Sequence, residues 1–448
     1  MTKNDFDDNR GIWIKLFSVD DLTLEALYAD IVKRNVSFDR RLLLTIKPWF
    51  VCLVSLFERL VTPKSHKEFD CTGDDFVFIT CPDPVHRVKN LSLIAGNLKY
   101  SKFFLPSTTR PTVVRQYYNY YKKETKENVF FGIFSYDDIR NYRTFLKENK
   151  EILNTIKCYS KEDTIALKYH VMRYALYSIY AKRAFAKIEN KSLWMFEHDK
   201  FFFIPVVEHF RKKRVTTIQM QHGTFFNPNT AVFIPLYTDK IICCSQREKF
   251  LYKESGVKDE DIYVVGAPLQ TIVEQKEIQV EVKYDILVLL TASSIALSVM
   301  ETTLEYLREH FADKKILLRF RLRSKDVDLK ALSHCIKGFS ISEGTSLFED
   351  ICSSQRVISF SEDANFEVIS IGKKFISFVN PSCLYRNYLD GICYTIENID
   401  ECMSKLMSSD DEMYNDRYVE AYGETDLNKI AKNFNTIITQ LKDSNHEN

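Results

Sequence analysis

The chain has 448 residues, a length that exceeds what one hydrophobic core usually organises, so we expect two domains. Hydrophobic residues make up 45% of it, which is enough for two cores. The 62 Lys and Arg residues offset the 61 Asp and Glu residues to a formal net charge of +1, which argues against a nucleic-acid partner attracted by bulk charge. An anionic ligand must therefore be held by local positive groups.

Residues 1–65 are predicted to form a helical extension, because apolar side chains recur at helical spacing through residues 22–34 and again through residues 42–61. Pro48 interrupts the second run. Within it, the segment WFVCLVSLF, from Trp49 to Phe57, is too short to span a bilayer. A helix buried in the core is the first interpretation of this segment, and a peripheral contact with a membrane is the second.

Residues 66–273 alternate short apolar runs with helical patterns, which is typical of a doubly wound parallel sheet. We expect strands at FVFIT, YSKFFLP, ENVFFG, SLWMFE, TIQM, KIICC and DIYVV. The charged stretch between Val273 and Val282 is the expected linker. These residues are therefore predicted to form a first Rossmann-like domain.

Residues 282–424 repeat the alternation, with strands expected at YDILVLL, KKILLRFRL, KGFSIS, RVISF and KFISFV. Residues 425–448 carry an amphipathic pattern that predicts a closing helix and tail. The predicted fold class is thus α/β, with two Rossmann-like domains whose parallel sheets face each other across a cleft, plus the helical extension.

Cysteine usage and the amino terminus both indicate the compartment. The 11 cysteines are odd in number and form no CxxC pair or metal-ligand spacing, which is the pattern of reduced thiols in a cytosolic protein. The opening stretch MTKNDFDDNRG is polar and acidic, unlike a secretory signal. We therefore expect a cytoplasmic protein.

Polar and small residues follow three apolar runs between Thr217 and Pro268. The first run ends in QHGT (221–224), the second in Ser245 and the third in GAP (266–268). Open α/β sheets bind ligands at the carboxyl ends of their strands, so this edge is the expected site.

The runs TIQMQHGTFF, TDKIICCSQ and DIYVVGAP resemble landmarks of GT-B glycosyltransferases of bacterial surface polysaccharides, the capsule-synthesis type with a QHG signature. The segment FSISEGTSLFEDICSSQRVISFSEDANFEVISIGKKFISF is similar to the nucleotide-sugar-binding half of those enzymes and of UDP-GlcNAc 2-epimerases. Teichoic-acid CDP-glycerol glycerophosphotransferases show a similar HGT motif. The resemblance covers about residues 190–380.

The resemblance implies a transferase that needs no metal or other cofactor and moves a sugar from a nucleotide-sugar donor to a bacterial surface glycan such as capsule or lipopolysaccharide. The glycan acceptor, free or lipid-linked, would bind to residues 66–273 and the nucleotide sugar to residues 282–424. Peripheral contact with the cytoplasmic face of the inner membrane would accompany a lipid-linked acceptor. The alternatives are a sugar-nucleotide epimerase or hydrolase, a CDP-polyol phosphotransferase of the teichoic-acid type, and a non-catalytic binding protein.

Donor-binding residues are expected in five segments of the chain. They are Gln221, Gly223, Thr224, Thr291, Ser293, Arg321, Arg323, Ser342, Ser361, Asn365 and Glu367. Thr291 and Ser293 sit in a strand-to-helix loop whose N–H groups suit a phosphate, unless the loop is a generic connection. In the family pattern Ser361 meets phosphate and Glu367 the ribose, although Glu362 and Asp363 would repel a diphosphate and a helix cap is the alternative.

Three arginines, at positions 319, 321 and 323, alternate along one strand and so share one face. Buried there, they would need anions to meet them, and a guanidinium binds phosphate through two hydrogen bonds. Arg321 and Arg323, nearest the strand end, are the better candidates. The alternative is an edge strand with a solvated face.

The catalytic candidates are His86, Glu197, Asp199 and His222. The resemblance places His222 near the donor phosphates or sugar, and a structural histidine is the alternative. His86 and Glu197 lead among candidates for a general base, ahead of other polar residues after strands: Asp83, Asp137, Asp138 and His198. A helix cap is the alternative for each carboxylate.

Overall fold

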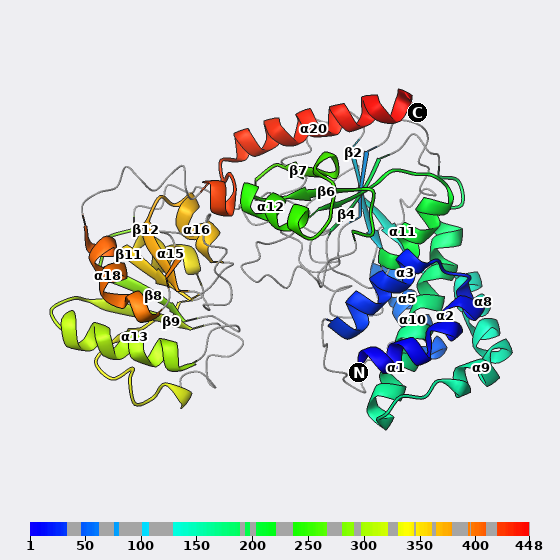
Figure 1. The fold of residues 1–448 in the computed structure, drawn as a ribbon, viewed down its shortest axis with the longest axis horizontal. Helices are drawn as coiled ribbons and strands as arrows, with labels where there is room; N and C mark the ends of the chain where they lie inside the picture. Colours follow the sequence, from blue (N-terminus) through cyan, green and yellow to red (C-terminus); the bar gives the residue numbers. More distant parts are fainter. Residues whose placement is uncertain are drawn as a thin grey trace.

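The computed structural model describes residues 1–33, 46–61, 76–79, 101–106, 129–188, 193–197, 203–220, 236–266, 280–290, 297–320, 330–344, 346–360, 364–378, 393–394, 396–408 and 419–447. These residues form two parallel sheets, each with its own helices, and the α/β class is confirmed (Figure 1).

The first sheet has the strand order β3-β2-β1-β4-β5-β6-β7, and its described pairings are all parallel. Every strand lies in a segment where an apolar run predicted one. The strands are β1 (Phe76–Ile79), β2 (Ser101–Pro106), β3 (Val129–Gly132), β4 (Leu193–Glu197), β5 (Thr217–Met220), β6 (Lys240–Cys243) and β7 (Ile262–Val264).

The second sheet repeats this topology with the order β10-β9-β8-β11-β12-β13. Its strands are β8 (Tyr284–Leu290), β9 (Ile316–Phe320), β10 (Ser340–Ile341), β11 (Ser354–Ser359), β12 (Lys374–Phe378) and β13 (Cys393–Tyr394). The short β13 was not expected, because two residues carry no readable period. In both sheets the order reverses once, between β1 and β4 and between β8 and β11.

Strand β8 shows why the second sheet needs helices on both faces. Leu287 and Leu289 belong to one buried cluster, with Ile351 of α15 (Leu347–Cys352). Ile286, Val288 and Leu290 alternate into the other cluster, with Leu304 of α13 (Leu297–His310). Successive side chains point to opposite faces, so a continuous apolar run packs against two helical layers.

The helices of the first half are α1 (Lys3–Asp8), α2 (Arg10–Phe17), α3 (Asp21–Tyr28), the π-helical turn η1 (Ala29–Lys33), α5 (Pro48–Val61), α8 (Tyr136–Glu148), α9 (Lys150–Thr155), α10 (Lys161–Ala184), α11 (Phe203–Lys212), α12 (Gln246–Glu254) and the short η3 (Asp259–Asp261). The second half adds α16 (Asn365–Ser370), η5 (Ile396–Asn398) and α18 (Ile399–Met407), and α20 (Leu427–Glu447) closes the chain.

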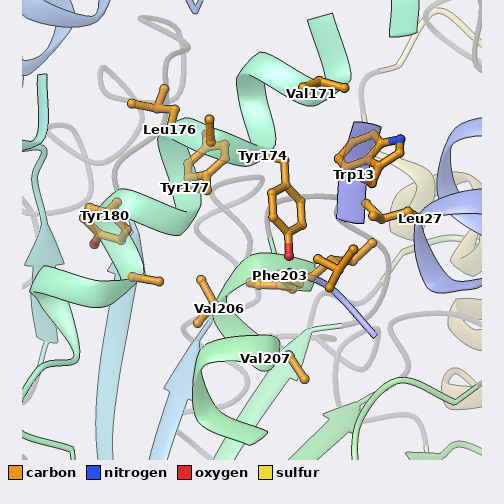
Figure 2. Close-up of a cluster of buried hydrophobic side chains, with 14 of the residues drawn as sticks. Trp13, Leu27, Val171, Tyr174, Leu176, Tyr177, Tyr180, Phe203, Val206 and Val207 are labelled. Atoms are coloured by element: carbon orange, nitrogen blue, oxygen red, sulfur yellow. The ribbon is translucent and has the colours of Figure 1, made fainter. Parts of the chain in front are cut away.

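The amino-terminal helices are built into the helical layer of the first half. Trp13 of α2 is fully buried and meets the ring of Tyr174 on α10 edge-on, with ring centres 5.5 Å apart (Figure 2). Phe17 stacks on Phe145 of α8 at 5.7 Å. Helices α1 to α3 therefore share one core with α8, α10 and α11.

Helix α20 lies along the first half of the molecule, although it follows the second half in sequence (Figure 1). The contact is close at Gly266, just beyond β7, where an added Cβ would come within 2.7 Å of Ile430 of α20. The carboxyl-terminal residues thus tie the two halves together.

Candidate functional site

The reversal of strand order gives each sheet one switch point, and its position is fixed by the register. In the first sheet Ile79, the last residue of β1, is level with Phe196 of β4. In the second, Ser359 at the end of β11 is level with Leu289 of β8. Neighbouring loops diverge to opposite faces at such points, and open sheets bind their ligands there.

The catalytic candidates follow the strands at and beside the first switch point. Glu197 is the last residue of β4 and is level with Met220, the last residue of β5. His222 comes two residues after Met220 in the chain, and His86 comes seven residues after the end of β1. His86, Asp199 and the QHGT residues 221–224 lie outside the described residues.

Several donor-binding candidates follow the strands at and beside the second switch point. Thr291 and Ser293 follow β8, Ser361 follows β11, and Arg321 and Arg323 follow β9. These five residues lie outside the described part of the chain. The strands that precede them are adjacent, since β9 pairs with β8 and β8 pairs with β11.

Arg319 forms a buried ion pair with Asp350. It is 7% exposed, and its Nη1 donates to Oδ2 of Asp350 and to the carbonyl oxygens of Gly344, at 3.4 Å, and Ser346, at 3.2 Å. Strand β9 pairs on both sides, so it is not an edge strand. The buried guanidinium therefore fastens β9 to the start of α15.

Ser342 belongs to the same cluster. Its Oγ donates to Oδ2 of Asp350 at 2.6 Å and lies 3.5 Å from Nη1 of Arg319. The hydroxyl predicted to bind donor thus holds the loop after β10. Sequence reasoning required anions for the arginines but did not find Asp350, because 31 residues separate the partners.

Helix α16 begins without a side-chain cap, because its N-cap residue is Ala364. Asn365 is fully buried, and its Nδ2 donates to Ser377 Oγ at 3.2 Å and to the Tyr422 hydroxyl at 3.0 Å. The amide anchors the first turn of α16 to β12 and to the carboxyl-terminal segment. Glu367 is half-buried in that turn.

Two polar residues near strand ends act as helix caps. Ser245 accepts a hydrogen bond from the backbone N–H of Glu248 at 3.2 Å and so caps α12. Asp138 forms a capping box with Ser135, and its two carboxylate oxygens share the single N–H of Arg183 Nε, at 2.8 and 2.9 Å. The cap alternative holds for Asp138.

The carboxyl ends of β6 and β7 are covered by the carboxyl-terminal segment. Gly423 has φ +98°, and a Cβ there would lie 2.0 Å from the carbonyl oxygen of Cys244. Tyr422 lies under the guanidinium of Arg247, whose Cζ is 5.8 Å from the ring centre. Sequence reasoning missed this contact, and the only local signal was a glycine between helical patterns.

Burial raises the pKa of the Cys243 and Cys244 thiols, and the nearby carboxylate of Glu248 adds to the effect. Both therefore stay protonated at neutral pH and pack as small apolar groups. In the part of the chain that is described, no group of three or more His, Cys, Asp and Glu side chains is placed to hold a metal ion. Nor does any described helix have the length and apolarity to cross a membrane.

No protein-family model matches the sequence, and no curated protein matches it significantly. Solved structures do resemble it. UDP-GlcNAc 2-epimerase from Methanocaldococcus jannaschii superposes with a TM-score of 0.52 at 11% identity, over 82% of this chain and 99% of that one. The same enzyme in complex with UDP-GlcNAc and UDP gives 0.50 at 12% identity, over 82% and 99%.

Two trehalose-related structures resemble the chain as well. The N-terminal domain of Candida albicans trehalose-6-phosphate phosphatase gives a TM-score of 0.53 at 9% identity, over 84% of this chain and 99% of that one. The α,α-trehalose 6-phosphate synthase of Burkholderia multivorans gives 0.50 at 8%, over 83% and 98%. These likenesses, over most of the length of each protein, show that the chain has the GT-B fold.

Proposed function

We propose that the protein is a nucleotide-sugar-dependent glycosyltransferase of the GT-B type that adds a sugar to a bacterial surface glycan without a metal ion. One observation carries the proposal. Each sheet reverses its strand order once, and the segments singled out for donor and acceptor chemistry follow the strands at and beside those two reversals.

In this proposal the second sheet holds the donor. Thr291, Ser293 and Ser361 follow the two strands of its switch point and would donate to the diphosphate, with Arg321 and Arg323 supplying positive charge. The carboxylate of Glu367 would accept from the ribose hydroxyls, and Asn365 would hold α16 in place for it.

The first sheet would carry the chemistry. Glu197 or His86 removes the proton from an acceptor hydroxyl as its oxygen attacks the anomeric carbon of the sugar, with Asp199 as a further candidate base. The bond from that carbon to the phosphate oxygen breaks, and the nucleoside diphosphate leaves with the electron pair. His222, in the QHGT segment, would donate to the leaving phosphate.

A sugar-nucleotide 2-epimerase is the second candidate, and the comparison favours it specifically. The Methanocaldococcus jannaschii epimerase, which has a similar fold, was solved with UDP-GlcNAc and UDP bound. The trehalose-6-phosphate synthase, also of similar fold, is named for a synthetic reaction and so agrees with the transferase. Both candidates require a nucleotide-sugar site at the second sheet, and only the transferase requires an acceptor.

A panel of UDP-, CMP-, GDP- and CDP-linked sugars in a thermal-shift assay tests the shared requirement. One nucleotide class is expected to raise the melting temperature, since a ligand at 100 times its Kd stabilises the native state by about 2.7 kcal/mol. Glu367→Gln should weaken that donor about tenfold, because a charged acceptor of hydrogen bonds is lost.

Glu349→Gln is the matched control, since Glu349 occupies the same position in the first turn of α15 and is exposed. Equal donor affinity in the two variants would refute the ribose role of Glu367. NMR of the donor with protein alone then separates the candidates, because a C2 epimer accumulates only with an epimerase. A panel in which no nucleotide sugar shifts the melting temperature would reject both.

A further inference from the structure

Helix α5 has a buried face and an exposed apolar face. Val51, Val54, Ser55 and Glu58 are buried against the first half, where α5 packs on α8. The opposite face is exposed and apolar throughout, and it comprises Trp49, Cys52, Leu53, Leu56, Phe57 and Leu60. Trp49 is 57% exposed and Leu60 is 76% exposed.

Such a face differs from scattered surface leucines. Its members recur three and four residues apart, so they form one continuous strip along the helix. Exposed contiguous apolar patches mark surfaces that bind a protein or a membrane. The six residues above are called the α5 strip below.

Exposed cations lie beside and on α5 and on α8, the helix that α5 contacts. Lys47 precedes the helix and Arg59 stands near its end, both exposed. The adjacent α8 exposes Arg140, Arg143 and Lys147 along one side. Two carboxylates, Asp137 and Glu148, are also exposed among the described residues of these two helices, so cations are in excess.

We propose that the α5 strip docks on a lipid bilayer that contains anionic headgroups. The apolar side chains enter the boundary between headgroups and acyl chains, Trp49 takes the interfacial position that tryptophan favours, and the cations meet the lipid phosphates. A 14-residue helix is about 21 Å long, which suits a helix lying in the plane of the membrane.

A second copy of the chain fits this surface less well. A twofold dimer places the same patch on both sides of the interface, so the excess of exposed cations on α5 and α8 of one copy would approach the same excess on the other. An anionic membrane satisfies the apolar face and the cations together. The inference concerns helix α5 rather than the segments that follow the strands, and it does not depend on the proposed reaction.

Vesicle sedimentation of the full-length protein tests the proposal. Wild type is expected to sediment with vesicles of phosphatidylcholine and phosphatidylglycerol, more weakly with phosphatidylcholine alone, and less as salt rises. Leu53→Gln/Leu60→Gln should lower the partition coefficient at least about tenfold, because the transfer of two leucine side chains from water into the membrane no longer contributes to binding.

The matched control Tyr159→Gln/Val282→Gln changes two exposed apolar residues elsewhere and should bind as wild type does. All four substitutions are at exposed sites, and equal melting temperatures establish that the variants fold. Equal vesicle binding by the two double variants, or no binding by wild type, overturns the proposal. So does a wild-type dimer in analytical ultracentrifugation that Leu53→Gln/Leu60→Gln dissociates.

Tryptophan fluorescence adds a readout specific to the α5 strip when wild type is compared with Trp49→Phe. The chain has three tryptophans, of which Trp13 is fully buried and Trp49 is exposed. Anionic vesicles should shift the emission of wild type to shorter wavelength. Trp49→Phe should abolish that shift while the protein still sediments with vesicles. A shift that persists in Trp49→Phe would mean that another segment enters the membrane and would overturn the proposal.

Discussion

Arg319 shows how this chain holds a charge inside its second sheet. The strand that carries it is buried along its length, so an isolated guanidinium there would be strongly destabilising. Asp350 neutralises it, and two backbone carbonyl oxygens accept from the same nitrogen, Nη1. One arginine thereby joins strand β9, the loop after β10 and the first turn of α15.

Removing either partner should cost about 3–5 kcal/mol of unfolding free energy, because the other charge stays buried. In urea denaturation, Arg319→Leu and Asp350→Leu are each expected to show this loss, and the double variant Arg319→Leu/Asp350→Leu should lose less than the sum. The control Lys405→Leu breaks an exposed pair with Glu401 and should cost under about 1 kcal/mol. Equal losses in Arg319→Leu and Lys405→Leu would contradict the buried-pair account.

Among the elements, the amino-terminal helices depend most on their neighbours. Helices α1 to α3 are each eight residues or fewer, which is too short to be stable alone. They are held by aromatic packing on α8 and α10, and by a hydrogen bond of 3.1 Å between Thr23 and Tyr237 hydroxyls. The chain start is thus an integral layer of the first half.

Trp13→Ala should lower the unfolding free energy by about 3–5 kcal/mol, since a large buried ring is removed and a cavity remains. The adjacent Ile14 is 48% exposed, and Ile14→Ala should change stability by under about 1 kcal/mol. Urea titration followed by circular dichroism measures both. A Trp13→Ala loss no larger than that of Ile14→Ala would show that these helices are not part of the cooperative unit.

At the scale of the whole molecule, the carboxyl-terminal segment links the two halves. Asn365 of the second half donates to Tyr422, which in turn lies under Arg247 of the first half. Gly423 then brings the backbone against Cys244, beyond the end of β6. The ends of β6 and β7 are occupied in this way, whereas β1, β4 and β5 precede the segments proposed to carry the chemistry.

Gly423→Ala should destabilise the protein by about 3 kcal/mol or more, because the backbone conformation disfavours a side chain and the added methyl group meets a carbonyl oxygen. Gly256→Ala is the matched control, with φ +92° but no atom within 4 Å of the added Cβ, and should cost about 1 kcal/mol. Thermal unfolding compares the two. Similar midpoints would mean that the close approach at Cys244 does not hold the halves together.

The sequence by itself determined the positions of nearly all the strands and the α/β class. Each strand is a short apolar run bounded by turn formers, and several helix starts follow a serine with an acid three residues later, as at Ser245 and Glu248. These signals are local. They also identified which segments follow the strand ends, and the proposed site residues lie in those segments.

Only the tertiary structure decided the strand order, the partner of Arg319, the enclosure of Asn365 and the exposure of the outer face of α5. Each depends on contacts between residues that are distant in the chain. The periodicity of side chains along one segment does not specify which distant residue packs against it. The helical pattern of residues 48–61 is compatible with burial on all sides. Packing left one side of that helix uncovered: among its described side chains, Val51, Val54, Ser55 and Glu58 are buried and the α5 strip is exposed.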